Sequence, residues 1–472
     1  MTLDVFSTAR EQVAAVSARD ISARELLELH LAQVARTNPA VNAVVSLDEE
    51  RAREGAAAAD RRTARGDVLG ALHGLPHAVK DTHEAAGWRT TYGSPLRADH
   101  VPRRDDLVVE RLRAAGVVLI GKTNVPEWAA GSHTFNPVFG TTRNPFDLSR
   151  SAGGSSGGAA AALASGMVPL ADGSDMGGSL RNPASFCNVV GLRPSVGRVP
   201  TWPATNAWEL TSVGGPMART VEDVALLLSV LAGPSARAPL SLETPGTAFA
   251  PPLHRTDLRG CRVALSIDLG GAFAVDPDVA EVVRSQGDVL AGLGASVREA
   301  HPVLHGADAA FRTLRAWVFH HRFRALLDKR PESFKGSLAD NIRAGEALTG
   351  EDVAVAYDRM TAIAERVRRF FEDVDLLVLP VSQVAPFPAD QEYPTVIDGQ
   401  AQRDYLDWMR SAYLVSVTGC PALSVPAGFT SQGWPVGLQL VGPPRGDRRL
   451  LEVAHVFEQA TRVGRRRPAL AT

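Results

Sequence analysis

Residues 153–181 read GGSSGGAAAALASGMVPLADGSDMGGSLR, and this stretch dominates the interpretation of the chain. Two glycine–serine groups, at 153–158 and 177–179, flank an alanine-rich segment that predicts a helix over 159–164. By composition alone, residues 151–158 are equally typical of a flexible linker. They lie between well-patterned segments rather than between domains, which favours a structured loop.

Helical and strand patterns alternate on both sides of this stretch. Ser22 can cap a helix over 24–35, and a helix over 107–115 precedes a buried strand over 117–120. Downstream, the pattern predicts strands over 188–192, 263–267, 295–299, 376–381, 420–426 and 436–441, and helices over 277–293 and through most of 305–372. The alternation is typical of an α/β protein.

Composition narrows the class of protein. The 472 residues carry 50 Lys and Arg against 52 Asp and Glu, so charge gives no reason to expect a nucleic-acid or anionic-membrane partner. No secretory signal and no run of about 18 apolar residues is visible. The cysteines, Cys187, Cys261 and Cys420, form no CxxC pair, which argues against disulfides and a cysteine-based zinc site. We therefore expect a cytoplasmic protein.

The second glycine–serine group could form a reaction site. Met176, Gly177, Gly178 and Ser179 supply four consecutive amides that could bind a developing oxyanion beside the Ser179 hydroxyl, which makes Ser179 a candidate nucleophile. Asp175 and Arg181 flank the group with opposite charges. They could fix the loop as a buried pair or form a surface salt bridge.

A serine nucleophile needs a base, and Lys80 is a candidate. It follows the apolar Ala78 and Val79 at the end of a predicted strand, where burial could lower its pKa from about 10.4 towards 7–8. Taken alone, it could equally be a surface residue or a salt-bridge partner of Asp81.

His73 and His77 are four residues apart, as a metal-binding pair on a helix would be. Gly74 and Pro76 lie between them and disfavour that helix, so we do not expect a metal pair. We expect no cofactor.

Together these motifs resemble the amidase signature family. The spacing of 24 residues between Ser155 and Ser179 matches the family. The resemblance covers roughly residues 20–232 and 372–460, and its segments lie at 121–127, 136–140, 153–158, 173–187, 191–194, 419–428 and 435–439.

The resemblance implies a Ser–cisSer–Lys triad. Ser179 would attack the carbonyl, Ser155, after a cis peptide bond, would relay the proton, and neutral Lys80 would accept it. Ser156 would support the loop by hydrogen bonding, and the backbone amides of 176–179 would form the oxyanion hole. No role follows for Asp172.

The implied fold is α/β/α, with a large mixed, twisted central sheet covered by helices on both faces. We expect one structural domain made of an N-terminal helical region (1–66), the amidase signature core (67–232), a Pro-rich connection (233–260), a variable, mainly helical region on the substrate side (261–372) and the C-terminal part of the same core (373–472).

The implied activity is an amidase that hydrolyses a small carboxylic amide, or a related carbamate, anilide or ester. Residues in segments that could line its substrate pocket are Trp128, Ala129, Gly131, Phe135, Trp202 and Trp208, although each aromatic could instead belong to the core. Members of the family are often dimers, so a homodimer is open.

Two rival functions remain. Residues 154–158 also fit G-x-S-x-G, the nucleophile turn of α/β-hydrolases, which would make Ser156 the nucleophile, but residues 144–150 make a poor preceding strand. The family also includes the amidase subunit of the glutamine-dependent tRNA amidotransferase, which would work inside a complex.

Overall fold

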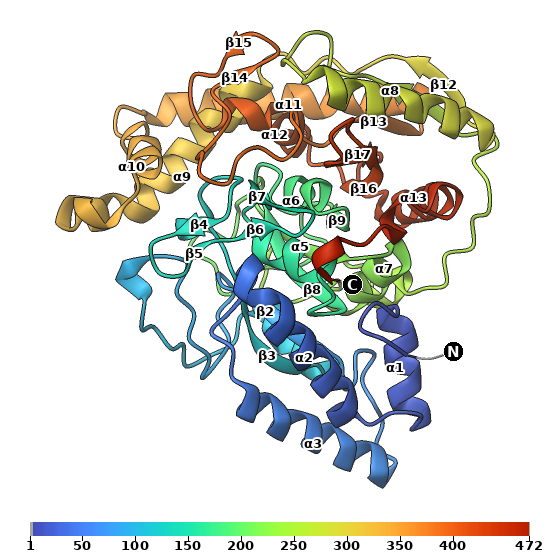
Figure 1. Ribbon diagram of the computed structural model, residues 1–472. Coiled ribbons are helices and arrows are strands. Elements are labelled where there is room, and N and C mark those ends of the chain that lie inside the picture. Colours follow the sequence, from blue (N-terminus) through green and yellow to red (C-terminus); the bar gives the residue numbers. More distant parts are fainter. Residues whose placement is uncertain (1–2, 472) are drawn as a thin grey trace.

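An eight-stranded mixed sheet forms the centre of the computed structural model, which describes residues 3–471 (Figure 1). Its order is β12 (Ser296–Glu299), β11 (Arg262–Leu265), β13 (Leu376–Pro380), β17 (Pro435–Val441), β16 (Ala422–Phe429), β9 (Val190–Arg193), β10 (Val213–Ala218), β8 (Leu170–Asp175). Strand β11 pairs in parallel with β12 and β13, and the other pairs are antiparallel. Every residue of β13 and β17 is buried, so helices cover both faces of the sheet.

A separate three-stranded sheet, in the order β1 (Val44–Val45), β3 (Val118–Thr123), β2 (Pro76–Lys80), carries Lys80. Strand β2 runs parallel to β3 and lies beside the edge strand β8. The amide of Lys80 donates to the carboxylate of Asp172 on β8, at 3.2 Å from Oδ2, so at this point a side chain joins the two sheets.

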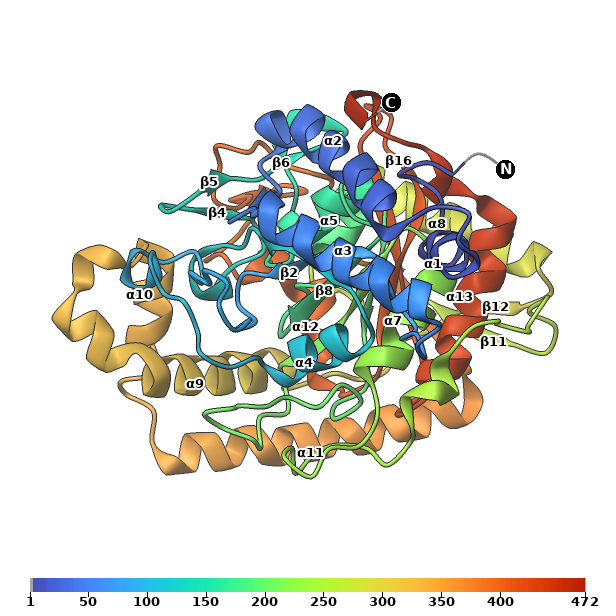
Figure 2. The same ribbon diagram turned by 90° about the horizontal axis from the view of Figure 1, so that it is seen from below.

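Two of the N-terminal helices, α2 (Ala23–Val41) and α3 (Glu49–Arg65), cover this second sheet (Figure 2). The first helix, α1 (Ala9–Ala18), packs instead against α7 (Val221–Leu231). Ser22 caps α2 and exchanges hydrogen bonds with Glu25, as the sequence predicted for the start of this helix. The region predicted to be helical also contains the short strand β1, because Val44 and Val45 pair with β3.

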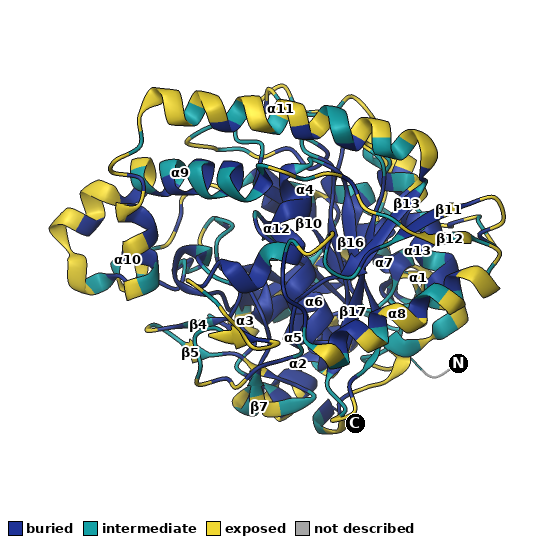
Figure 3. Ribbon diagram, turned by 90° about the horizontal axis from the view of Figure 1, so that it is seen from above, coloured by how far each residue is buried: buried dark blue, intermediate teal, exposed yellow. Residues whose placement is uncertain are grey.

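The first glycine–serine group and the segment after it form an unbroken buried stretch over residues 151–173. Residues 151–158 are all buried, so the linker interpretation is wrong. The predicted helix is α5 (Gly157–Ala164), and it lies with α6 (Arg181–Phe186) at the dark, buried centre of Figure 3. The remaining helices of the core are α4 (Leu107–Ala114), α7 (Val221–Leu231), α8 (Pro277–Gly292), α12 (Arg410–Val417) and α13 (Asp447–Thr461).

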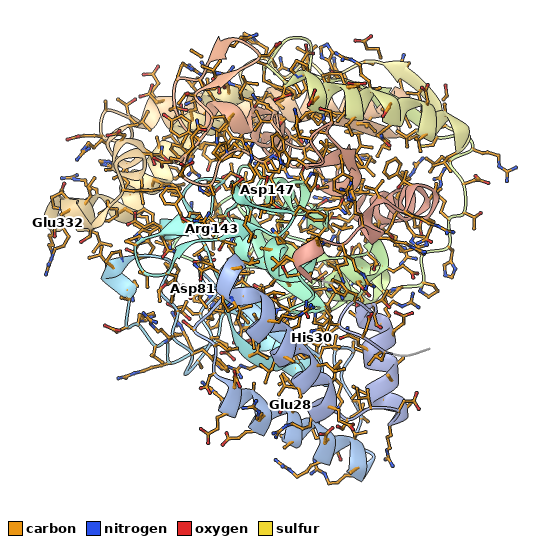
Figure 4. All side chains as sticks on the ribbon, in the orientation of Figure 1. Glu28, His30, Asp81, Arg143, Asp147 and Glu332 are labelled. Carbon is orange, nitrogen blue, oxygen red and sulfur yellow. The ribbon has the colours of Figure 1, made fainter. Side chains whose placement is uncertain are left out.

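A helical lobe stands on one side of the core. It consists of α9 (Ala307–Lys329), α10 (Gly336–Arg343) and α11 (Gly350–Asp373), and α9 packs against α10, α11 and α12. Glu332, labelled in Figure 4, marks its outer edge. Short two-stranded ribbons complete the structure: β4 (Phe135–Asn136) with β5 (Gly140–Thr141), β6 (Arg143–Asn144) with β7 (Asp147–Ser151), and β14 (Val396–Ile397) with β15 (Gln400–Ala401). Across residues 3–471, no helix combines the length and apolar character needed to span a membrane.

Candidate active site

The first glycine–serine loop lies between β7 and α5, where surrounding polar groups fix its backbone. The peptide bond between Gly154 and Ser155 is cis. The hydroxyls of Thr134 and Ser132 donate to the carbonyls of Gly153 and Gly154, at 2.8 and 2.5 Å. A Cβ on Gly158 would lie 2.3 Å from the backbone nitrogen of Asn124, so only glycine fits there.

Lys80 ends β2 directly beneath this loop. Its Nζ donates to three hydroxyl oxygens: Ser155 and Ser156 at 2.9 Å, and Ser174 at 3.0 Å. The Lys80 side chain is fully buried. It does not pair with Asp81, whose carboxylate instead accepts hydrogen bonds from the amide and hydroxyl of Thr91. Asp81 is labelled in Figure 4. The salt-bridge interpretation of Lys80 is therefore wrong.

Burial sets the charge of Lys80. Loss of hydration lowers the pKa of its amine from its usual value near 10.5 to about 7, and the negative charges of Asp172 and Asp175 partly oppose this. A large fraction of the amine is therefore neutral near pH 7 and can accept a proton.

A buried carboxylate that the sequence left without a role adjoins Lys80. Asp172 accepts hydrogen bonds from His77 Nε2 at 2.8 Å and from His83 Nδ1 at 2.6 Å, as well as from the Lys80 amide. Burial raises the pKa of Asp172, but the hydrogen bonds from the two histidines outweigh it and hold the pKa well below the usual range. The pattern H-x-x-K-x-x-H over 77–83 was the available sequence signal, but nothing in it pointed to Asp172.

The second glycine–serine loop is built around Asp175. Its carboxylate accepts from the Gly178 amide at 2.9 Å and forms ion pairs with Arg181 at 2.9 Å and Arg193 at 3.1 Å. All three charged side chains are fully buried, so the flanking pair is internal rather than on the surface. Burial raises the pKa of Asp175, and the two guanidinium groups more than reverse this.

This network corrects the predicted oxyanion hole at one position. Because the Gly178 amide donates to Asp175, it is not directed at a substrate oxygen. Gly178 adopts φ of 111°, which favours glycine. Within the described residues, the amides of Met176, Gly177 and Ser179 have no such acceptor. The Ser179 carbonyl accepts from the Ser156 amide at 3.2 Å, which joins the two loops.

The two loops open into a cavity of about 850 Å³. Ser155 and Ser179 both line it, together with Met176 and Gly177. Three other walls of the cavity come from the segment 128–131, the segment 196–214 and helix α9.

The predicted substrate residues divide into two groups. Trp128, Ala129 and Gly131 line the cavity, as does Trp202, and the Trp128 ring packs 5.0 Å from that of Phe323. Phe135 and Trp208 do not line it. Trp208 is 64% exposed, because it lies in a surface loop, so its assignment to the pocket is corrected.

Comparison with known proteins agrees with this architecture. The family model Amidase matches residues 25–451. An acylamidase of Rhodococcus erythropolis is 38% identical over 98% of this chain and 97% of its own. One subunit of the glutamyl-tRNA(Gln) amidotransferase of a Synechococcus strain is 36% identical over 96% of each chain.

Solved structures give the same result. A bacterial aryl acylamidase of the amidase signature family superimposes with a TM-score of 0.91 at 30% identity, covering 98% of this chain and 97% of its own. The chain thus belongs to the amidase signature family, and it is an amidase, a hydrolase of carbon–nitrogen bonds other than peptide bonds.

Proposed function

We propose that this amidase cleaves aryl or other apolar acylamides through an acyl-enzyme on Ser179, with Ser155 as proton relay and Lys80 as base. The observation that carries the proposal is the 2.9 Å contact between the buried Lys80 Nζ and Ser155 Oγ, in a cavity that Ser155 shares with Ser179. A neutral amine in contact with a hydroxyl is the arrangement that general-base activation requires.

In this mechanism, Ser179 Oγ attacks the amide carbonyl while its proton passes to Ser155 Oγ and the Ser155 proton passes to Lys80 Nζ. The carbonyl oxygen becomes an oxyanion that the Met176, Gly177 and Ser179 amides would stabilise. The proton then returns through Ser155 to the leaving nitrogen, and the C–N bond breaks. Water attacks the resulting ester and releases the acid and free Ser179.

The substrate class is supported by the walls of the cavity. Trp128, Trp202 and Phe323 present apolar surface to it, and the acylamidase relatives act on acylated amines by name. Carbamates, anilides and esters present a similar planar carbonyl, so the same groups could attack them.

The direct test compares 4-nitroacetanilide with acetamide. We expect kcat/KM to be at least about tenfold higher for the anilide, because its ring buries apolar surface in the cavity. Ser179→Ala should abolish both activities. Equal turnover of the two amides would contradict the aromatic pocket, whereas full activity of Ser179→Ala would contradict the nucleophile.

Membership of an amidotransferase complex is the second candidate function, favoured by the relative at 36% identity. It predicts glutaminase activity and dependence on partner subunits. Robust anilide hydrolysis by the purified single chain, with no ammonia released from glutamine, would reject it.

The proposed compartment is the cytoplasm. The support is that Cys187, Cys261 and Cys420 are free, buried thiols, as suits a reducing environment. A homodimer stays a prediction from the family, and sedimentation of the purified chain would test it.

A further inference from the structure

Helix α9 directs one face at the reactive loop. Phe311, Arg315 and Phe319 are spaced four residues apart and therefore lie along one side of the helix. All three line the cavity. Gly177 lies against Phe311, since a Cβ built on Gly177 would be 3.0 Å from the Phe311 ring. One turn further, Nη1 of Arg315 lies 3.1 Å from Sδ of Met176.

Arg315 differs from the other buried arginines. Four arginine side chains are more than nine-tenths buried in the described chain, and three of them pair with a carboxylate: Arg181 and Arg193 with Asp175, and Arg198 with Asp447. Arg315 is 5% exposed, yet no carboxylate oxygen among residues 3–471 lies within 4.0 Å of it.

Among residues 3–471, only neutral groups hold its guanidinium. Nε donates to Asn341 Oδ1 at 3.0 Å, and Nη2 donates to the Tyr405 hydroxyl at 2.8 Å. The third partner is the thioether of Met176, a weak acceptor. The group also stacks on Phe319, with Cζ 4.2 Å from the ring centre. The charge is therefore fixed in position but not neutralised.

A buried charge without a counter-ion is costly in free energy. For a guanidinium, the partner that best offsets this cost is a carboxylate bound through two parallel hydrogen bonds. Two further arginines, Arg104 and Arg322, line the cavity. Three acidic residues also line it, Glu84, Asp106 and Glu209, so a bound anion is inferred from the local surroundings of Arg315 and not from the total charge of the cavity.

We propose that Arg315 binds a carboxylate of the substrate, so that the preferred substrates are acylamides with an anionic group on the acyl or the amine part. This inference rests on the proposed reaction at Ser179 and specifies its substrate class. The Arg315 Cα lies about 6 Å along the helix from that of Phe311, which packs on the reactive loop. The carboxylate is therefore expected several bonds away from the scissile carbonyl.

The test uses two pairs of probes that differ in charge but hardly in shape. On the acyl side, the mono(4-nitroanilide) of glutaric acid is compared with the 4-nitroanilide of 5-oxohexanoic acid. On the amine side, 4-acetamidobenzoate is compared with 4-acetamidoacetophenone. The quantity measured is the ratio of kcat/KM for the acid over its neutral partner.

In one of the two pairs, the wild-type ratio should exceed about 10, and Arg315→Met should lower it about ten- to a hundredfold. The pair that responds identifies the side that carries the carboxylate. Arg315→Lys keeps the charge but loses the planar fork, so its ratio should be intermediate. Arg324→Met removes a 67% exposed charge from the same helix and should leave the wild-type ratio.

Binding to the Ser179→Ala variant, followed by calorimetry, separates this inference from the proposed reaction because it needs no turnover. The acid of the responding pair should bind at least about tenfold more tightly than its neutral partner, and adding Arg315→Met should remove the difference. Equal binding within both pairs would overturn the inference. So would an Arg315→Met variant that weakens acid and neutral probes alike, since that would mark a purely structural role.

Discussion

Two of the walls of the cavity, one formed by the glycine–serine loops and one formed by α9, are built in different ways. On the reactive wall, the loops around Ser155 and Ser179 are held by buried hydrogen bonds and by the ion pairs of Asp175 with two arginines. On the wall that α9 forms beside these loops, aromatic rings and Arg315 line the cavity, while the helix also carries exposed ion pairs such as Arg324–Asp328. In the proposed mechanism, the first wall would carry out the chemistry and the second would select the substrate.

The largest effect should follow removal of a reactive group from the first wall. Ser179→Ala, Ser155→Ala and Lys80→Met should each lower kcat by about 10⁴-fold or more, because these groups act as one unit. Ser156→Ala should cost much less, since its proposed role is to support the loop. Steady-state anilide kinetics give the result. Equal losses for Ser156→Ala and Ser179→Ala would remove the distinction between a supporting and a reacting serine.

The next effect concerns stability. Arg181→Met leaves the buried Asp175 carboxylate with only one of its two arginine partners, so the free energy of unfolding should fall by about 3–5 kcal/mol. The matched change on the other wall, Arg324→Met, should alter it by no more than about 0.5 kcal/mol. Urea denaturation measures both. A similar small loss in the two variants would show that the buried network does not hold the reactive wall.

The same contrast explains what could be predicted from the sequence. The loops of the reactive wall could be predicted from the sequence. They need glycine where the backbone packs closely against a neighbour, as at Gly158, and this requirement appears as a local run of glycine and serine. The role of Asp172 was not, because its partners, His77 and His83, lie on another strand and in the loop after it. The prediction that the Gly178 amide is free to bind an oxyanion was wrong. Sequence spacing does not show that the Asp175 side chain folds back to accept a hydrogen bond from this amide.

The substrate wall was predicted least well. Nothing in the sequence favoured Trp128 over Trp208 as a pocket residue. In the structure, Trp128 packs against Phe323 in the cavity, whereas Trp208 lies exposed in a surface loop. Arg315 carried no signal at all. An arginine within a helical pattern is ordinary, and only tertiary structure shows that Arg315 is buried with no counter-ion in the part of the chain that the structure describes.

A smaller effect should follow changes in those aromatic residues. Trp128→Ala should lower the ratio of kcat/KM for 4-nitroacetanilide over acetamide by about three- to tenfold, because a ring contact with the substrate is lost. Trp208→Ala, on the exposed loop, should leave the ratio unchanged. If both variants shifted the ratio equally, the cavity would not be the aryl-binding site.

The smallest effect concerns pH. Activity should decline as pH falls through about 7, because protonated Lys80 cannot accept the proton. The charge of Asp172 favours the protonated amine, so Asp172→Asn should lower the pKa of Lys80 and move this acid limb to lower pH. The pH profile of kcat/KM between about pH 5 and 9, recorded for the wild type and the variant, measures this shift of the acid limb. A limb that moves to higher pH in the variant would contradict the assigned electrostatics.

The central claim, that Ser179 is the nucleophile activated by its neighbours, is tested most directly by covalent labelling. The purified chain is treated with a fluorophosphonate, and the modified residue is located by peptide mass spectrometry. The account predicts one adduct, on Ser179, formed far more slowly when Lys80 is replaced by methionine. An adduct on Ser156, or unchanged labelling of the Ser179→Ala variant, would contradict it.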